Sequence, residues 1–115
     1  MGVDLNLLPV NSKGSWFCFE TITCERNRDL WAAIEMRGEI PVGEDVWCHH
    51  AESVDGDTRY GPVRVTPYDT PLTWLPAGAL ADIMRDQGGY GWKHKAVAAF
   101  LAELPADWPV VLFWH

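Results

Sequence analysis

The run VWCHHA places a cysteine directly before two histidines, and thiolate and imidazole groups are common ligands of zinc and iron. In an extended strand, successive side chains point to opposite faces, so Cys48 and His50 share one face and His49 lies on the other. Cys48 and His50 could hold one ion together if His94, His115 or a carboxylate completed the site. Structural zinc sites usually show paired ligands at both ends, and the sequence offers no second pair. We therefore predict a half-buried strand without metal or cofactor, with a metal- or ligand-binding protein or enzyme as the alternative.

Three other patterns that could carry chemistry are incomplete. The segment DGDTRYG begins like a calcium loop, but Arg59 stands at a ligand position and Tyr60 at the required glycine. The segment GGYGWK opens a helix with glycines and a lysine, yet it fits neither phosphate-binding glycine pattern. No serine lies in a G-x-S-x-G elbow. The sequence therefore predicts no catalytic residue and a non-enzymatic protein.

Charge is the remaining functional signal. The chain has a net charge of −7, and positions 38–58 contain six acids and no lysine or arginine. These acids are Glu39, Glu44, Asp45, Glu52, Asp55 and Asp57. Direct binding to nucleic acid needs clustered basic residues, so this composition argues against it. A continuous negative surface would instead steer a basic partner toward the protein, although a solvated sheet edge accounts for the same residues.

The first part of the chain predicts two strands and a helix. Residues 3–10 alternate apolar and polar side chains, and residues 16–23 are rich in aromatic and β-branched types, so the two segments should pair antiparallel. Thr23 is a suitable N-cap for a helix that runs to Arg37 and ends at Gly38. The apolar stripe of this helix is Leu30, Trp31 and Ile34.

A hairpin is expected around Asp55-Gly56, a dipeptide suited to a type I′ turn. Strands 46–53 and 59–66 would flank the turn, and the numbers of paired residues add to 111 in this register. The register sets Glu52 against Arg59, an opposite-charge pair that favours it. It also sets Cys48 against Val63 and Val46 against Val65.

The second half of the chain predicts a short strand at 72–75 and two helices, at 77–87 and 92–104. Their apolar residues recur with the helical period, as Leu80, Ile83 and Met84 and as Val97, Phe100, Leu101 and Leu104. The last segment, 109–115, has five consecutive apolar residues, which is typical of a strand buried on both faces. The fold class is therefore α+β, with three helices and an antiparallel or mixed sheet of about five strands in one domain, 1–115.

The cysteines and the absence of long apolar runs suggest a compartment. Cys18, Cys24 and Cys48 form an odd set without C-x-x-C spacing, which is typical of free thiols in a reducing environment. No apolar stretch approaches the roughly 18 residues of a membrane span, and the first residues lack the basic region of a signal peptide. We therefore expect a cytoplasmic protein without membrane contact.

Several short motifs resemble those of small uncharacterised proteins that bacteriophages and prophages encode. They are MGVDL with PV at the start, ERNRDLW at 25–31, and the short stretches YG, TPY and PL between Tyr60 and Leu72. The resemblance spans most of the chain and carries no catalytic residue. It implies a protein in the cytoplasm of a bacterial host that binds and disables a host protein or protein–nucleic-acid complex, as anti-CRISPR and anti-restriction inhibitors do. A virion structural or assembly protein is a further alternative.

Overall fold

The computed structural model describes most of the chain, and the structural statements below concern that part. The described residues are 4–12, 14, 16–18, 20–24, 27–48, 53–54, 57–58, 61–66, 70–86 and 91–114. The radius of gyration is 13.7 Å, close to the value of about 13 Å expected of one domain of this length. The α+β class with three helices and a five-stranded sheet is confirmed.

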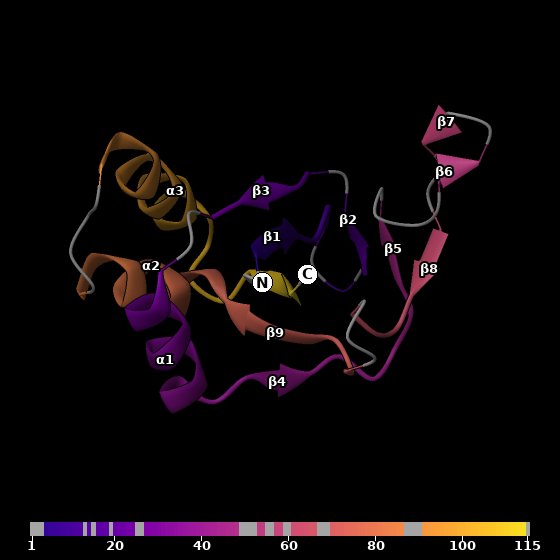
Figure 1. Cartoon of the computed structure of the whole chain (residues 1–115), viewed down its shortest axis with the longest axis horizontal. Coiled ribbons are helices and arrows are strands. Elements are labelled where there is room, and N and C mark those ends of the chain that lie inside the picture. The colour runs from indigo at the N-terminus through magenta and orange to yellow at the C-terminus, as the bar shows by residue number, and fades with distance from the viewer. Residues whose placement is uncertain are drawn as a thin grey trace.

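The central sheet is antiparallel and has the order β3-β1-β10-β9-β4. Its strands are β3 (Ile22–Thr23), β1 (Leu5–Pro9), β10 (Pro109–Trp114), β9 (Thr73–Pro76) and β4 (Ile40–Pro41). The longest pairing joins β1 to β10, the first and last strands of the chain. This pairing places residues from both ends of the sequence in the middle of the fold (Figure 1).

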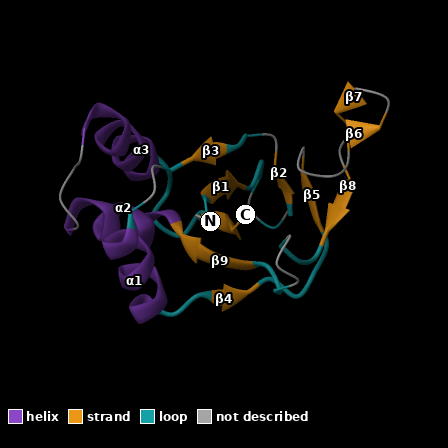
Figure 2. Ribbon diagram, viewed as in Figure 1, coloured by secondary structure: helices purple, strands orange, loops and turns teal. Residues whose placement is uncertain are grey.

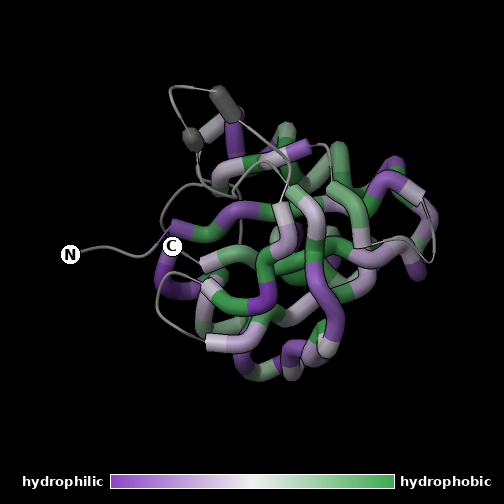
Figure 3. Tube along the Cα trace, turned by 90° about the vertical axis from the view of Figure 1, so that its right-hand side faces the viewer, coloured by the Kyte–Doolittle hydropathy of each residue, from purple (hydrophilic) through white to green (hydrophobic). Residues whose placement is uncertain are grey.

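Three helices cover one face of the central sheet (Figure 2). They are α1 (Arg28–Arg37), α2 (Ala77–Asp86) and α3 (Gly91–Glu103). Their buried side chains pack on Leu5, Leu7 and Leu112 of the sheet. The predicted helix stripes are largely confirmed, although Phe100 remains 39% exposed. Hydrophobic positions accordingly run through the middle of the molecule (Figure 3).

A second, smaller sheet covers the opposite face, which the sequence did not predict. It has the order β2-β5-β8, with β2 at Phe17–Cys18, β5 at Val46–Cys48 and β8 at Gly61–Val63. Its residues form a separate core with Leu8, Val111 and Phe113 of the central sheet. The result is three layers: helices, a five-stranded sheet and a three-stranded sheet (Figure 1).

The two-sided burial of the central sheet was predicted for its last strand and not for its first. All five residues of β1 are buried, including Asn6, which is 2% exposed. Asn6 Oδ1 accepts a hydrogen bond of 2.6 Å from the Thr23 hydroxyl of β3. The polar residue in the alternating pattern of β1 is therefore a buried asparagine whose side-chain oxygen is hydrogen-bonded, and it does not mark a face of the strand exposed to solvent.

The antiparallel pair predicted between 3–10 and 16–23 is correct only for its second part. β3 pairs with β1, but β2 joins the small sheet and runs parallel to β5. The start of α1 also differs from the prediction, because Asn27 and not Thr23 is the N-cap. The Asn27 side chain accepts hydrogen bonds from the backbone N–H groups of Asp29 and Leu30. The predicted end at Gly38 is confirmed.

The hairpin register needs one correction. β6 (Ser53–Val54) and β7 (Asp57–Thr58) pair around positions 55–56 as predicted. Lower in the hairpin, Val46 lies opposite Val63, and Cys48 opposite Gly61, a shift of two residues. The shift arises because four residues, 49–52, separate β5 from β6, whereas only two separate β7 from β8. An even shift leaves the faces unchanged, so Val46 and Cys48 are buried and Trp47 is 44% exposed, as expected.

Within the described residues, none of the three helices has the length and apolarity needed to cross a bilayer.

Candidate functional site

The structure places three of the six acids predicted to bind a partner. Glu39 and Glu44 lie on either side of β4, and Asp45 directly precedes β5. Glu44 is exposed. Glu52 and Asp55 lie outside the described residues, as does the side chain of Asp57 at the start of β7. Half of the predicted acidic surface can therefore be followed in the structure.

Asp45 already has a basic partner within the chain. The Arg64 Nε–H donates to Asp45 Oδ1, and the exposed fractions of the Arg64 and Asp45 side chains are 68% and 41%. The sequence interval 38–58 contains no cation, but the chain returns after the hairpin and brings Arg64 beside it. This ion pair offsets the charge of Asp45 locally, so the negative surface is weaker there than the sequence suggested.

Glu39 is half-buried and tightly placed. Its Oε1 atom accepts hydrogen bonds of 3.0 Å from the Thr73 hydroxyl and from the Trp114 indole Nε1–H. Thr73 lies on β9 and Trp114 at the end of β10, so Glu39 joins the chain after α1 to two central strands. Both bonds go to one oxygen, and Oε2 has no hydrogen-bond donor among the described residues.

Glu39 forms one wall of a pocket of about 260 Å³, which Trp31, Glu35 and Trp114 complete. The two indole rings meet nearly at right angles, with 6.0 Å between their centroids and 88° between their planes. Trp31 and Glu35 stand one turn apart on α1, and Glu35 is exposed. The pocket therefore combines a corner of two aromatic rings with two carboxylates. Neither carboxylate forms an ion pair with another described residue.

Trp31 has a further peculiarity. Its Nε1 atom is buried and has no hydrogen-bond acceptor among the described residues. Buried indole N–H groups usually have a partner, so this one marks a site where an acceptor is missing. By contrast, the Trp114 N–H is satisfied by Glu39. One wall of the pocket is thus held by a hydrogen bond and the other by packing alone.

The alternative site at Cys48 and His50 is only partly described, because His49, His50 and His115 lie outside the described residues. Cys48 is buried and lies in register with Cys18 across the parallel β2–β5 pair. Among the residues that the structure describes, no three His, Cys, Asp or Glu side chains gather closely enough to hold a metal ion. The Cys18 thiol donates to the Leu8 carbonyl over 3.4 Å.

The thiols of Cys18 and Cys24 favour the protonated form. Burial, together with the neighbouring Cys48, raises the pKa of Cys18 from 9.0 to about 12. Burial likewise raises the pKa of Cys24 to about 11, although Lys93 acts weakly in the opposite direction. Because the thiolate is the nucleophile and the metal ligand, these two cysteines are poorly suited to either role at neutral pH.

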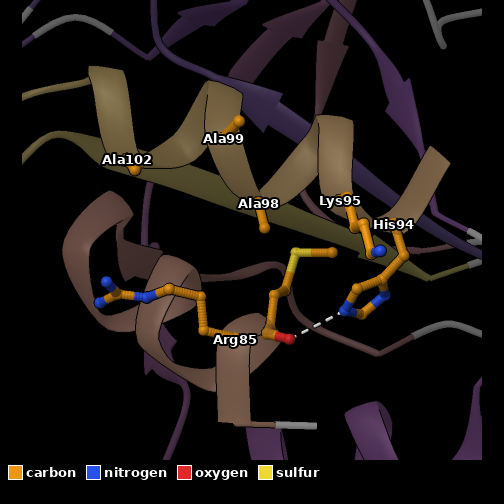
Figure 4. Close-up of a pocket in the computed structure, with 7 residues that line it drawn as sticks. Arg85, His94, Lys95, Ala98, Ala99 and Ala102 are labelled. Carbon is orange, nitrogen blue, oxygen red and sulfur yellow. Dashed lines mark hydrogen bonds between the residues drawn. The ribbon is translucent and has the colours of Figure 1, made fainter. Parts of the chain in front are cut away.

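His94, the other histidine considered as a ligand, lies between α2 and α3 and contacts the end of α2. It is 6% exposed, and its Nε2 atom lies 2.8 Å from the Met84 carbonyl oxygen (Figure 4). It lines a hollow of about 350 Å³ between α2 and α3, whose other walls are mostly methyl and methylene groups from Met84, Ala98, Ala99 and Ala102, with Arg85 and Lys95. Arg85 is paired with Asp82. The hollow offers packing surface but no set of polar groups directed at one point.

Three of the four residues of the Trp31 pocket were absent from the predicted site. Trp31 was assigned to the core stripe of its helix, and Trp114 to a strand buried on both faces. Each lies at the margin of the core and is partly exposed. The spacing of Trp31 and Glu35 by four residues was the available signal, because it sets both on one helix face. No local sequence pattern indicates that Trp114 lies beside Trp31 and Glu35.

Comparison of the chain with protein-family models, with curated proteins and with solved structures found no match.

Proposed function

We propose that this protein is a non-enzymatic protein–protein interaction module that captures a partner with a basic surface. The observation that carries the proposal is the pocket of Trp31, Glu35, Glu39 and Trp114. It combines two aromatic walls with two carboxylates that have no cation of their own among the described residues. The net charge of −7 acts in the same direction over a longer range.

The two kinds of side chain have different tasks in such an interface. Surface carboxylates such as Glu35 and Glu44 attract a basic partner and raise its association rate. Tryptophans are the residues that most often dominate binding energy once a complex has formed. An interface centred on the pocket therefore has both a steering and an anchoring element. Asp45 contributes less, because Arg64 offsets its charge.

The resemblance to small phage proteins supports a narrower version of the proposal. The partner would be a host defence complex whose basic surface normally receives nucleic acid, and the protein would block that surface in the bacterial cytoplasm. Acidic side chains can occupy the phosphate-binding positions of such a surface, because both present negative oxygen atoms to lysine and arginine.

The proposal is tested by affinity capture from a bacterial host lysate at low and high salt, followed by mass spectrometry. The first variant is Glu35→Gln with Glu39→Gln, which removes two charges and keeps the side-chain shapes. We expect it to lower recovery of the basic partner by about tenfold at low salt. Its matched control is Glu20→Gln with Glu103→Gln, two exposed acids that do not line the pocket, which should leave recovery unchanged.

A second variant tests the hairpin acids predicted from the sequence. Reversing the charges of Glu52, Asp55 and Asp57 to lysine should also weaken capture by about tenfold if these acids face the partner. The wild type and both variants that lack acids would recover equal amounts of the same partner, at low and at high salt, if the interface were not electrostatic. That result would refute an electrostatic interface.

A further inference from the structure

Building on the proposed function, we propose that the pocket of Trp31, Glu35, Glu39 and Trp114 receives an arginine side chain of the protein partner. The argument rests on the indole corner, on the two carboxylates and on the missing acceptor at Trp31. Each feature restricts the chemistry of the occupant in a different way.

The indole corner selects a cation with a flat face. Aromatic rings carry negative charge on their faces, and tryptophan attracts cations more strongly than tyrosine or phenylalanine. The planes of Trp31 and Trp114 differ by 88°, so a group in the corner lies over one ring face and beside the other. A planar guanidinium can stack on one indole while its edge stays free to donate hydrogen bonds.

The carboxylates select a cation that donates several hydrogen bonds. The Trp114 and Thr73 donors both bind Oε1 of Glu39, which fixes the carboxylate and leaves Oε2 without a donor among the described residues. Glu35 brings a second carboxylate from the adjacent turn of α1. A guanidinium has five N–H donors in a fixed fork, so it can serve both acids at once.

The other common cations fit less well. A lysine ammonium is strongly hydrated and loses more solvation on entering a half-buried pocket than the weakly hydrated guanidinium does. A quaternary ammonium suits the indole corner but has no N–H, so it would cover the carboxylates without hydrogen-bonding them. Arginine alone satisfies both halves of the pocket.

An arginine within a peptide also brings hydrogen-bond acceptors, which suits the unpaired N–H of Trp31. A guanidinium only donates, so it cannot satisfy an indole N–H. An arginine within a chain is flanked by backbone carbonyl groups, which are acceptors. The Trp31 N–H has no acceptor among the described residues, and a peptide carbonyl is an acceptor of the kind it lacks.

The test uses the full ¹⁵N-labelled chain and follows the indole N–H signals of Trp31 and Trp114 by NMR. Spectra of Trp31→Phe and Trp114→Phe assign the two signals. The probe is N-acetyl-arginine amide, which carries the guanidinium and two flanking carbonyls. Its neutral counterpart is N-acetyl-citrulline amide. We expect saturable shifts of both signals with the arginine probe and an affinity at least about fivefold lower for citrulline.

Three results would overturn the inference. The first is equal affinity for the arginine and citrulline probes. The second is tighter binding of N-acetyl-lysine amide or tetramethylammonium than of the arginine probe. The third is a saturating arginine titration in which neither indole N–H signal shifts. Glu35→Gln with Glu39→Gln should lower the arginine affinity at least about fivefold, whereas Glu20→Gln with Glu103→Gln should not change it. A cooperative thermal unfolding transition well above the temperature of the titration shows that the first variant remains folded.

The two proposals can fail separately. Arginine binding at the pocket, combined with full partner capture by the Glu35→Gln, Glu39→Gln variant, would refute an interface centred on the pocket and leave the pocket as an arginine site. Partner capture that depends on these acids, without any arginine response of the two indoles, would refute the arginine site and leave the interface.

Discussion

The carboxylate of Glu39 accepts the indole N–H of Trp114 over 3.0 Å, across 75 positions of the sequence. The same oxygen accepts the Thr73 hydroxyl, so one side chain holds the end of the last strand against the chain that follows α1. An acid that the sequence assigns to the surface is therefore also a structural element. Its two roles can be separated by the choice of substitution.

Replacing Glu39 by alanine should lower the free energy of unfolding by about 1–3 kcal/mol, because two half-buried donors lose their acceptor. Glu39→Gln keeps an acceptor oxygen and should cost less than half as much. Urea denaturation at neutral pH measures both values. Equal losses in the two variants would mean that the hydrogen bonds do not stabilise the fold.

Replacing Asn27 by alanine should destabilise the protein by about 1 kcal/mol, because the backbone N–H groups of Asp29 and Leu30 lose their acceptor. Asn27→Asp keeps an acceptor at the helix N-terminus and should be close to neutral. Denaturant titrations of the two variants check this difference. A helix that began at Thr23, as the sequence first suggested, would be insensitive to either change.

Replacing His94 should destabilise the contact between α2 and α3. Met84 lies in the last turn of α2, where carbonyl groups have no partner within the helix, and the His94 ring N–H supplies one. We expect His94→Phe, which keeps a ring and removes the donor, to cost about 1–3 kcal/mol. His94→Gln, which keeps a donor, should cost less than the phenylalanine variant. The reverse order in thermal or urea unfolding would contradict this role.

Raising the pH above 9 should weaken the fold through the buried thiols. Burial lifts the pKa of Cys18 to about 12 and that of Cys24 to about 11, from 9.0. Between pH 9 and these values, the unfolded chain loses thiol protons that the folded chain keeps, so unfolding becomes more favourable as pH rises. The loss from pH 8 to pH 10 is about 1 kcal/mol for each thiol.

The measurement is urea unfolding at pH 8 and pH 10 in the presence of a reducing agent. The Cys24→Ala variant should show a smaller decrease in stability over the same interval, since the thiol of Cys24 no longer titrates. An identical pH dependence in the wild type and in this variant would assign the effect to other groups.

Much of the local structure could be predicted from the residues themselves. The periodicity of Leu30 and Ile34 identified the buried face of α1, and Gly38 marked its end. The alternation around Val46 and Cys48 identified their buried face even though the register was shifted, because a shift of two residues preserves the faces. These signals are reliable because helical and strand periods act over a few residues.

The position of Thr23 shows where local reasoning failed. Threonine is a good N-cap, but here its hydroxyl is taken by Asn6 of the neighbouring strand. Asn27, four residues later, caps the helix instead. The choice between two suitable caps depends on a contact with β1, which no local pattern contains.

The sequence by itself determined the α+β class, the three helices, the two-sided burial of the last strand and the acidity of the protein. Only the tertiary structure decided which charges and rings meet. It brought Arg64 to Asp45 and Trp114 to Glu39 and Trp31, and it placed a second sheet over the first. The reason is physical: side-chain periodicity reports which face of a helix or strand is buried. Contacts between distant residues depend instead on the order of the strands in the sheet and on the path of the connections between them. One and the same periodic pattern is compatible with several such arrangements.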